Sequence, residues 1–177
     1  ASTEVTLVKN RHIVKAVSLP IGALTLTGTY QKGDEYTPKE LEKMTKAVKK
    51  TIKEHTWLQN IKLPLLGIGG TARNIAKIDQ RKLSYPITKL HNYELPYHRF
   101  HEILEDVKGK SLEARKKISG LSSDRADIII AGLTIVDELF NYVNTKTLVV
   151  GGCGLREGLF YDYYGENYLG GNSIIDD

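Results

Sequence analysis

The fold is decided by the stretch Leu63-Pro64-Leu65-Leu66-Gly67-Ile68-Gly69-Gly70-Thr71-Ala72-Arg73, which predicts a buried strand, a glycine turn and a helix in succession. Glycines at the end of a strand let the backbone approach a ligand where a Cβ atom would collide. The helix N-terminus that follows offers unpaired N–H groups, which suit phosphate. The pattern matches neither a Walker loop nor the dinucleotide fingerprint, so a tight turn without a ligand is the alternative interpretation.

A second junction of the same kind lies near the C-terminal end. The apolar run Thr147–Val150 leads into Gly151-Gly152-Cys153-Gly154, and a helix is predicted from Leu155. Two strand–glycine–helix junctions, each preceded by a helix, imply parallel strands whose carboxyl ends open at one edge of a sheet. Ligands of open α/β sheets bind at that edge, so the two junctions together predict a phosphate or nucleotide cleft.

The remaining pattern is that of an α/β protein. A hairpin is predicted from two β-rich runs around Asn10-Arg11, and a helix with a capping box begins at Thr37. The run 21–30 is ambiguous, and 83–95 is predicted to be extended or irregular. Further helices are predicted for residues 74–78 (short), from Pro96, for 111–117 (short) and from Ser122-Ser123-Asp124, the last being the longest.

Arg125 falls in the first turn of that predicted longest helix, where a cation opposes the helix dipole. An anionic ligand would compensate this local cost. An ion pair with Asp124 or Asp127 would do so equally well, and local sequence does not separate the two explanations.

Length and composition are those of one globular domain. The chain has 177 residues, of which 41% are hydrophobic, and no apolar run reaches the ~20 residues of a membrane span. One cysteine, Cys153, excludes an internal disulfide and fits a reducing cytoplasm. The net charge of +4 permits an anionic ligand. We expect an ordered domain over residues 1–164, a poorly ordered tail over 165–177, and an origin as an excised domain, because Ala1 stands where an initiator methionine would.

Several motifs together resemble the exopolyphosphatase and guanosine pentaphosphate phosphohydrolase (Ppx/GppA) family. They run in the family's order from Ser2 to about Tyr161. Besides the Gly67–Arg73 turn, they are Ala76-Lys77-Ile78, Tyr85-Pro86, Leu90-His91-Asn92-Tyr93, Gly120-Leu121-Ser122, Arg125-Ala126-Asp127-Ile128-Ile129 and Gly154-Leu155-Arg156-Glu157-Gly158.

The resemblance implies the second domain of a two-domain, ribonuclease H-like protein of the actin, Hsp70 and sugar-kinase superfamily. Such enzymes release terminal phosphate from polyphosphate or guanosine pentaphosphate with a divalent metal such as Mg²⁺. By resemblance, Ser2, Thr3, Gly69, Gly70, Thr71 and Arg125 would bind phosphate or nucleotide, and Glu4 would hold the metal or orient water. Neither DNA nor a membrane is expected as a partner.

Two departures from the family pattern concern the region before Ser2. The family's strand ending in an aspartate and a glycine run is absent, as is the first domain with its general-base glutamate. We therefore expect the isolated chain to have little or no phosphatase activity. The missing central strand would leave sheet edges open, to be covered by another chain (as in a homodimer), by the tail or by a shifted register.

Two other functions fit parts of the sequence. One is a non-catalytic nucleotide-binding, polyphosphate-binding or dimerisation domain of the same fold. The other is half of a sugar or acid kinase, which shares the glycine turns but does not account for the motifs at Leu90–Tyr93 and Arg125–Ile129.

Overall fold

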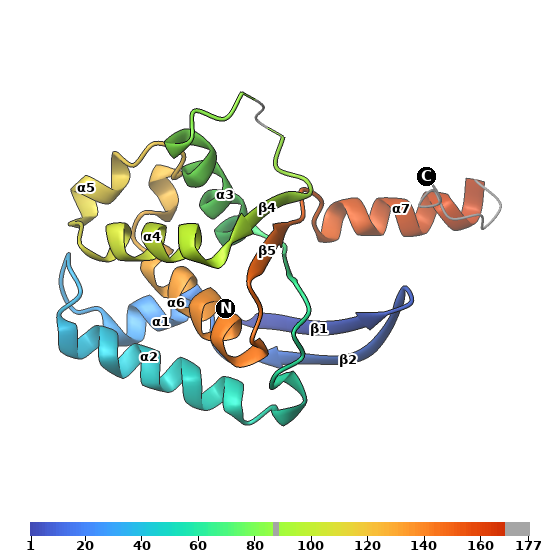
Figure 1. Cartoon of the computed structure of the whole chain (residues 1–177), viewed down its shortest axis with the longest axis horizontal. Helices are drawn as coiled ribbons and strands as arrows, with labels where there is room; N and C mark the ends of the chain where they lie inside the picture. Colours follow the sequence, from blue (N-terminus) through green and yellow to red (C-terminus); the bar gives the residue numbers. More distant parts are fainter. Residues whose placement is uncertain (87–88, 169–177) are drawn as a thin grey trace.

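The computed structural model describes residues 1–86 and 89–168, and it has the expected α/β architecture (Figure 1). Two strands form an N-terminal hairpin and three form a second sheet. The strands are β1 Thr3–Lys9, β2 His12–Leu19, β3 Leu65–Gly67, β4 Tyr93–Pro96 and β5 Thr147–Val150. The helices are α1 Ala23–Tyr30, α2 Pro38–Lys53, α3 Gly70–Lys82, α4 Tyr97–Lys108, α5 Leu112–Lys116, α6 Ile129–Val143 and α7 Leu155–Tyr168, with 3₁₀ turns at Thr56–Leu58 and Ser123–Arg125.

The strand pairing confirms the prediction of parallel junctions. β3 pairs with β5 in parallel, with Leu65 opposite Leu148 and Gly67 opposite Val150, while β4 runs antiparallel on the other side of β5. Both strand–glycine–helix junctions therefore lie at the same edge of the three-stranded sheet. The predicted hairpin is also confirmed, with β1 and β2 antiparallel.

In the described residues no strand joins the two sheets, whose orders are β1-β2 and β3-β5-β4. Within the described residues β3 is therefore an edge strand. Leu66 is 62% exposed, so the prediction of a buried strand here was wrong, because no neighbouring strand covers it. Figure 1 shows the hairpin extending away from the three-stranded sheet.

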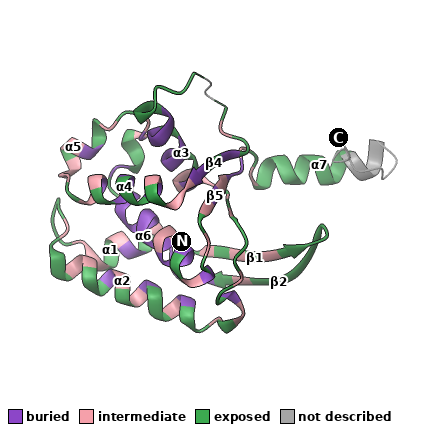
Figure 2. Cartoon of the chain, viewed as in Figure 1, coloured by how far each residue is buried: buried purple, intermediate pink, exposed green. Residues whose placement is uncertain are grey.

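The core is built around α6, which is buried along most of its length by α1, α2, α3 and α4 (Figure 2). Phe140 of α6 stacks against Phe100 of α4 at 5.0 Å between ring centroids. By contrast, α7 projects from the body, and its described side chains are exposed. None of the helices in the described part of the chain is long and apolar enough to span a membrane.

Two of the helix predictions were wrong. The helix after Ser122 begins only at Ile129, since residues 123–125 form a separate 3₁₀ turn that Ser122 does not cap through its side chain. That helix has 15 residues and is shorter than α2, which has 16 and the predicted capping box at Thr37. The segment predicted as a short helix at 74–78 is part of α3, which has 13 residues.

The predicted tail boundary falls inside α7. Residues 165–168 form the last turn of that helix. The rest of the predicted tail, 169–177, lies outside the described residues.

Candidate anion-binding site

The N-terminus of α3 follows directly from β3 through Gly69. Gly69 has φ +107° and ψ −172°, a backbone conformation essentially restricted to glycine, and this lets the chain turn at once from strand to helix. Among the described residues, no side chain forms a capping hydrogen bond at this end of α3. The first N–H groups of a helix have no partners within it, so those of Gly70, Thr71 and Ala72 are available to a ligand.

Arg125 lies over this helix end. A Cβ atom placed on Gly70 would be 3.0 Å from both Cζ and Nη1 of Arg125, so glycine is what lets the guanidinium lie against the backbone. In the described residues Arg125 forms no ion pair, with Asp124 or Asp127 or any other carboxylate; Asp127 instead accepts a hydrogen bond from its neighbour Ile128 N–H at 2.9 Å. The ion pair with Asp124 or Asp127 is therefore not formed within the described residues, and the exposed guanidinium of Arg125 is accessible to an anion.

Arg73 adds a second cation to the turn, which the sequence reasoning did not single out. Its Nε donates to the carbonyl oxygen of Gly69 at 3.4 Å, so the side chain folds back toward the N-terminus of its own helix. The i, i+4 spacing of the two residues on a helix that begins at Gly70 is the signal that identifies this contact.

Thr71 lies at the same turn but its side chain packs inward. A Cβ on Gly132 of α6 would be 2.8 Å from the Thr71 hydroxyl oxygen, so the Thr71 side chain occupies the space that Gly132 leaves open. At this turn Thr71 can therefore offer a ligand its backbone N–H, while its side chain fixes α3 against α6.

The second junction contacts the first and closes its own helix end. Gly151 N–H donates to the Gly67 carbonyl at 2.9 Å, and Gly152 N–H donates to Nδ1 of His91 at 3.1 Å. At the start of α7, the Glu157 carboxylate accepts from Gly154 N–H at 2.7 Å, and this bond lowers the pKa of Glu157. A carboxylate thus already accepts a hydrogen bond at the start of α7, whereas within the described residues the start of α3 has no side-chain cap.

Ser2, Thr3 and Glu4 lie at the start of β1, on the separate hairpin. The Glu4 carboxylate accepts hydrogen bonds from the hydroxyls of Ser2 at 2.7 Å and Ser18 at 3.0 Å, which lower the pKa of Glu4. Thr3 donates its hydroxyl to the Ile21 carbonyl at 2.6 Å. Within the described residues no hydrogen bond or ion pair links these three residues to the Gly69–Thr71 turn or to Arg125.

The described residues contain no group of three or more His, Cys, Asp or Glu side chains placed to hold a metal ion. Glu4 is an ionised single carboxylate, and Mg²⁺ in phosphate sites is often held by one or two carboxylates together with the phosphates and water. The Glu4 carboxylate is chemically suited to bind Mg²⁺, but within the described residues no other carboxylate, histidine or cysteine joins it in a metal-binding group.

A sequence model that describes the Ppx/GppA phosphatase family matches residues 1–166 of this chain. Over 142 residues the chain is 25% identical to exopolyphosphatase 2 of Mycobacterium tuberculosis, covering 78% of this chain and 44% of that protein. Over 161 residues it is 26% identical to a guanosine-5'-triphosphate,3'-diphosphate pyrophosphatase of Pseudoalteromonas translucida, covering 91% of this chain and 31% of the relative.

The crystal structure of the Aquifex aeolicus Ppx/GppA family member superposes with a TM-score of 0.81 and 28% identity, covering 94% of this chain and 54% of that one. The chain thus spans about a third to a half of the length of these relatives. The actin-like, ribonuclease H-like fold expected from the motifs is confirmed.

Proposed function

Because the chain belongs to the Ppx/GppA phosphatase family, we propose that it is part of a phosphohydrolase that releases terminal phosphate from polyphosphate or guanosine pentaphosphate. In this proposal the chain forms one wall of a cleft, and the remaining wall with the general base is supplied by a first domain. The observation that carries the proposal is the Arg125 guanidinium, which lies against Gly70 at the start of α3 and, within the described residues, forms no ion pair there.

The chemistry of phosphoanhydride hydrolysis fits these groups. The transferred phosphoryl group develops charge on its oxygens, which backbone N–H groups and guanidinium ions stabilise. The N–H groups of Gly70 and Thr71 would bind those oxygens, and Arg125 would neutralise part of their charge. A divalent cation such as Mg²⁺, when bound, would neutralise part of the phosphate charge. The Glu4 carboxylate would help to hold it, and the Ser2 and Thr3 hydroxyls would bind phosphate.

A decisive experiment assays a full-length protein that includes this chain against polyphosphate and guanosine pentaphosphate, with and without Mg²⁺. We expect phosphate release that needs Mg²⁺ and that falls in an Arg125→Gln variant. Lys50→Gln, which removes a charge from the solvent face of α2, serves as the control. Equal rates for the two variants would contradict the role of Arg125.

The 177-residue chain by itself is expected to bind these anions with little or no turnover, since the general base is assigned to the other domain. Metal-dependent phosphate release by this chain at the rate of the full-length protein would overturn that assignment. Binding without turnover in the full-length protein as well would instead favour a non-catalytic binding or dimerisation domain of the same fold. Native mass spectrometry of the chain tests the homodimer.

A further inference from the structure

A pocket of about 370 Å³ lies on α3, away from its N-terminus. One wall is formed by Lys77, Gln80 and Arg81 of α3, and the other by the loop Ser119–Ser122. None of these groups belongs to the site around Gly70 and Arg125. Lys77 and Arg81 are both exposed at this pocket, so their charges are accessible to an anionic ligand.

The charge of this pocket is positive and uncompensated. Lys77 and Arg81 are four residues apart on one helix, a spacing at which like charges destabilise each other. Neither cation forms an ion pair or a side-chain hydrogen bond in the part of the chain that the structure describes, and no carboxylate lines the pocket.

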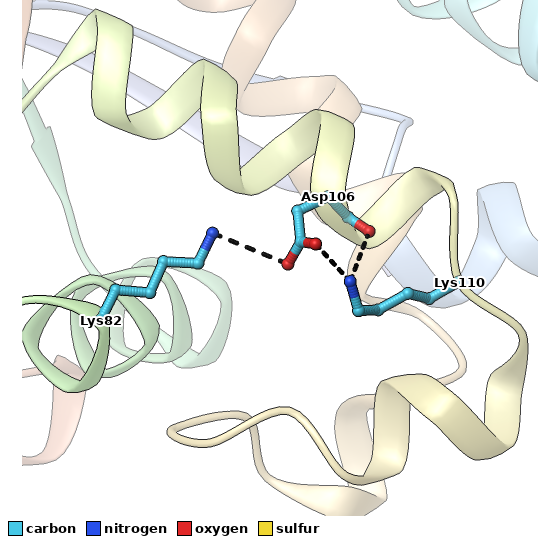
Figure 3. Close-up of polar contacts among 3 residues, drawn as sticks. All are labelled: Lys82, Asp106 and Lys110. Carbon is cyan, nitrogen blue, oxygen red and sulfur yellow. Dashed lines mark hydrogen bonds and ion pairs between the residues drawn. The ribbon is translucent and has the colours of Figure 1, made fainter.

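The neighbouring residue Lys82 shows what pairing looks like at this end of α3. Its Nζ lies 3.6 Å from the Asp106 carboxylate of α4, which also accepts a hydrogen bond from Lys110 (Figure 3). Asp106 is thus paired with Lys82 and Lys110. Within the described residues, Lys77 and Arg81 have no such carboxylate partner.

The loop wall is held firmly against α3. Gly120 has φ +94°, and a Cβ there would lie 2.5 Å from the Lys77 carbonyl oxygen, so the loop backbone packs directly on the helix. Ser122 N–H donates to the Asn74 side-chain oxygen at 2.8 Å. In the described residues the hydroxyls of Ser119 and Ser122 take part in no hydrogen bond, which leaves both as donors to a ligand.

Asn74 connects this pocket to the helix N-terminus. Its side-chain nitrogen donates to the Gly70 carbonyl at 2.8 Å, while its oxygen holds Ser122. Lys77 lies about 10 Å along α3 from Gly70, at 1.5 Å per residue. A single phosphate group cannot contact both places, whereas a chain of phosphates can.

Resting on the proposed function, we propose that the Lys77–Arg81 pocket is a second phosphate-binding site, which anchors a polyphosphate chain by phosphates other than the one at Gly70. Two cations with flanking hydroxyls bind phosphate oxygens through charge-assisted hydrogen bonds. If this is so, the chain should bind a long linear polyphosphate more tightly than a compact nucleotide.

The test measures binding of long-chain polyphosphate, tripolyphosphate and inorganic phosphate to the 177-residue chain by isothermal titration calorimetry. The pocket variant is K77Q/R81Q, and the matched control K43Q/K50Q removes two charges from the solvent face of α2. Both variants are first checked by circular dichroism for native helix content.

We expect the pocket variant to lose at least about tenfold in affinity for long-chain polyphosphate, because charge-assisted hydrogen bonds each contribute substantially. The control should lose much less, and tripolyphosphate affinity should be nearly unchanged. Equal losses in the two variants, or no binding of long-chain polyphosphate by the parent chain, would overturn the proposal. Tight binding of inorganic phosphate that depends on Lys77 and Arg81 would overturn its assignment to a polymer.

Arg125→Gln separates this proposal from the proposed function. If Arg125→Gln leaves all affinities unchanged while K77Q/R81Q weakens long-chain binding, the pocket stands and the site at Gly70 fails. If Arg125→Gln weakens tripolyphosphate binding and K77Q/R81Q has no effect on any ligand, the proposed function stands and the pocket fails.

Discussion

The guanidinium of Arg125 rests on the backbone of Gly70, where a side-chain methyl group would stand 3.0 Å from its Cζ. The two residues are 55 positions apart in the chain (125 − 70), yet the missing side chain of Gly70 leaves the room that the guanidinium occupies. Glycine, which has no Cβ atom, lets the cation approach the backbone closely at this position.

Gly70→Ala therefore separates binding from folding. The new methyl group would displace only the flexible end of Arg125, so the thermal midpoint should stay within a few degrees of the parent value. Tripolyphosphate affinity should fall by roughly tenfold, the order expected for a disturbed charged hydrogen bond. Calorimetric titration checks the affinity, and thermal unfolding by circular dichroism checks the fold. Gly158→Ala on α7, where a Cβ meets nothing within 4 Å, is the control.

Tyr93→Phe should destabilise the fold without affecting phosphate binding. The Tyr93 hydroxyl donates to the buried Asp79 carboxylate at 2.6 Å, and Arg99 donates to the same oxygen at 3.1 Å. Burial, and then the bond to Asp79, raise the pKa of Tyr93, so it remains a donor at neutral pH. Removing it should cost about 1–3 kcal/mol of unfolding free energy in urea titrations. A loss of anion affinity with unchanged stability would contradict this structural role.

Asp106→Asn should reveal an acid-dependent contribution to stability. The hydrogen bond from Lys110 holds the pKa of Asp106 below its usual value, with Lys82 acting in the same direction. A lowered folded-state pKa adds stability above the unfolded pKa of about 4, and that stability is lost as the pH falls through the folded value. The variant should be less stable than the parent at pH 7, and the difference should vanish in strong acid. Glu113→Gln, which breaks an exposed pair with Lys116, should change stability little at either pH.

Glu138→Gln should change stability in the opposite direction to Asp106→Asn, by making the protein more stable at pH 7. Burial raises the pKa of Glu138 in spite of the nearby Lys49, and no hydrogen bond to its carboxylate is found in the described residues. A raised folded-state pKa makes the parent lose stability as the pH rises from the unfolded pKa through the folded one. The variant should therefore unfold at a higher temperature at pH 7 and at the parent's temperature in strong acid. A lower midpoint at pH 7 would show that the carboxylate has a stabilising partner. Glu42→Gln on the surface of α2 is the control.

The elements that sequence predicted best are those whose local signals agree with their tertiary setting. The capping box of α2 and the apolar periodicity around it gave its start correctly. The two glycine junctions gave the parallel pairing of β3 and β5, because strand, turn and helix follow one another within a few residues.

The errors arose where long-range contacts decide the structure. The sequence predicted only a short helix at 74–78 because Asn74, Asp79 and Gln80 interrupt the apolar pattern of α3. These residues are buried, and their partners lie elsewhere in the chain: the Ser122 N–H, the side chains of Tyr93 and Arg99, and the Lys89 carbonyl. α1, with Gly28 and three threonines, has weak helix propensity and is covered by α6.

At the site, the sequence identified the glycine turn and Arg125 as candidates but did not predict that they lie next to each other in space. It placed Arg125 in the first turn of α6, whereas the 3₁₀ turn at Ser123–Arg125 sets it beside Gly70 instead. Arg73 was missed because its role depends on the side chain folding back toward Gly69.

The separation of β1-β2 from the three-stranded sheet has a consequence for how different parts of the molecule unfold locally. The described residues share no backbone hydrogen bonds between the two sheets, and the hairpin joins the hydrophobic core through Val5, Val17 and Leu19. Amide hydrogen exchange should accordingly be slowest in α6 and faster in the outer hairpin, where Val8, Ile13 and Val14 are exposed. The hairpin that carries Ser2, Thr3 and Glu4 would then be a separate low-stability unit, which a bound phosphate chain or a neighbouring domain could set in place.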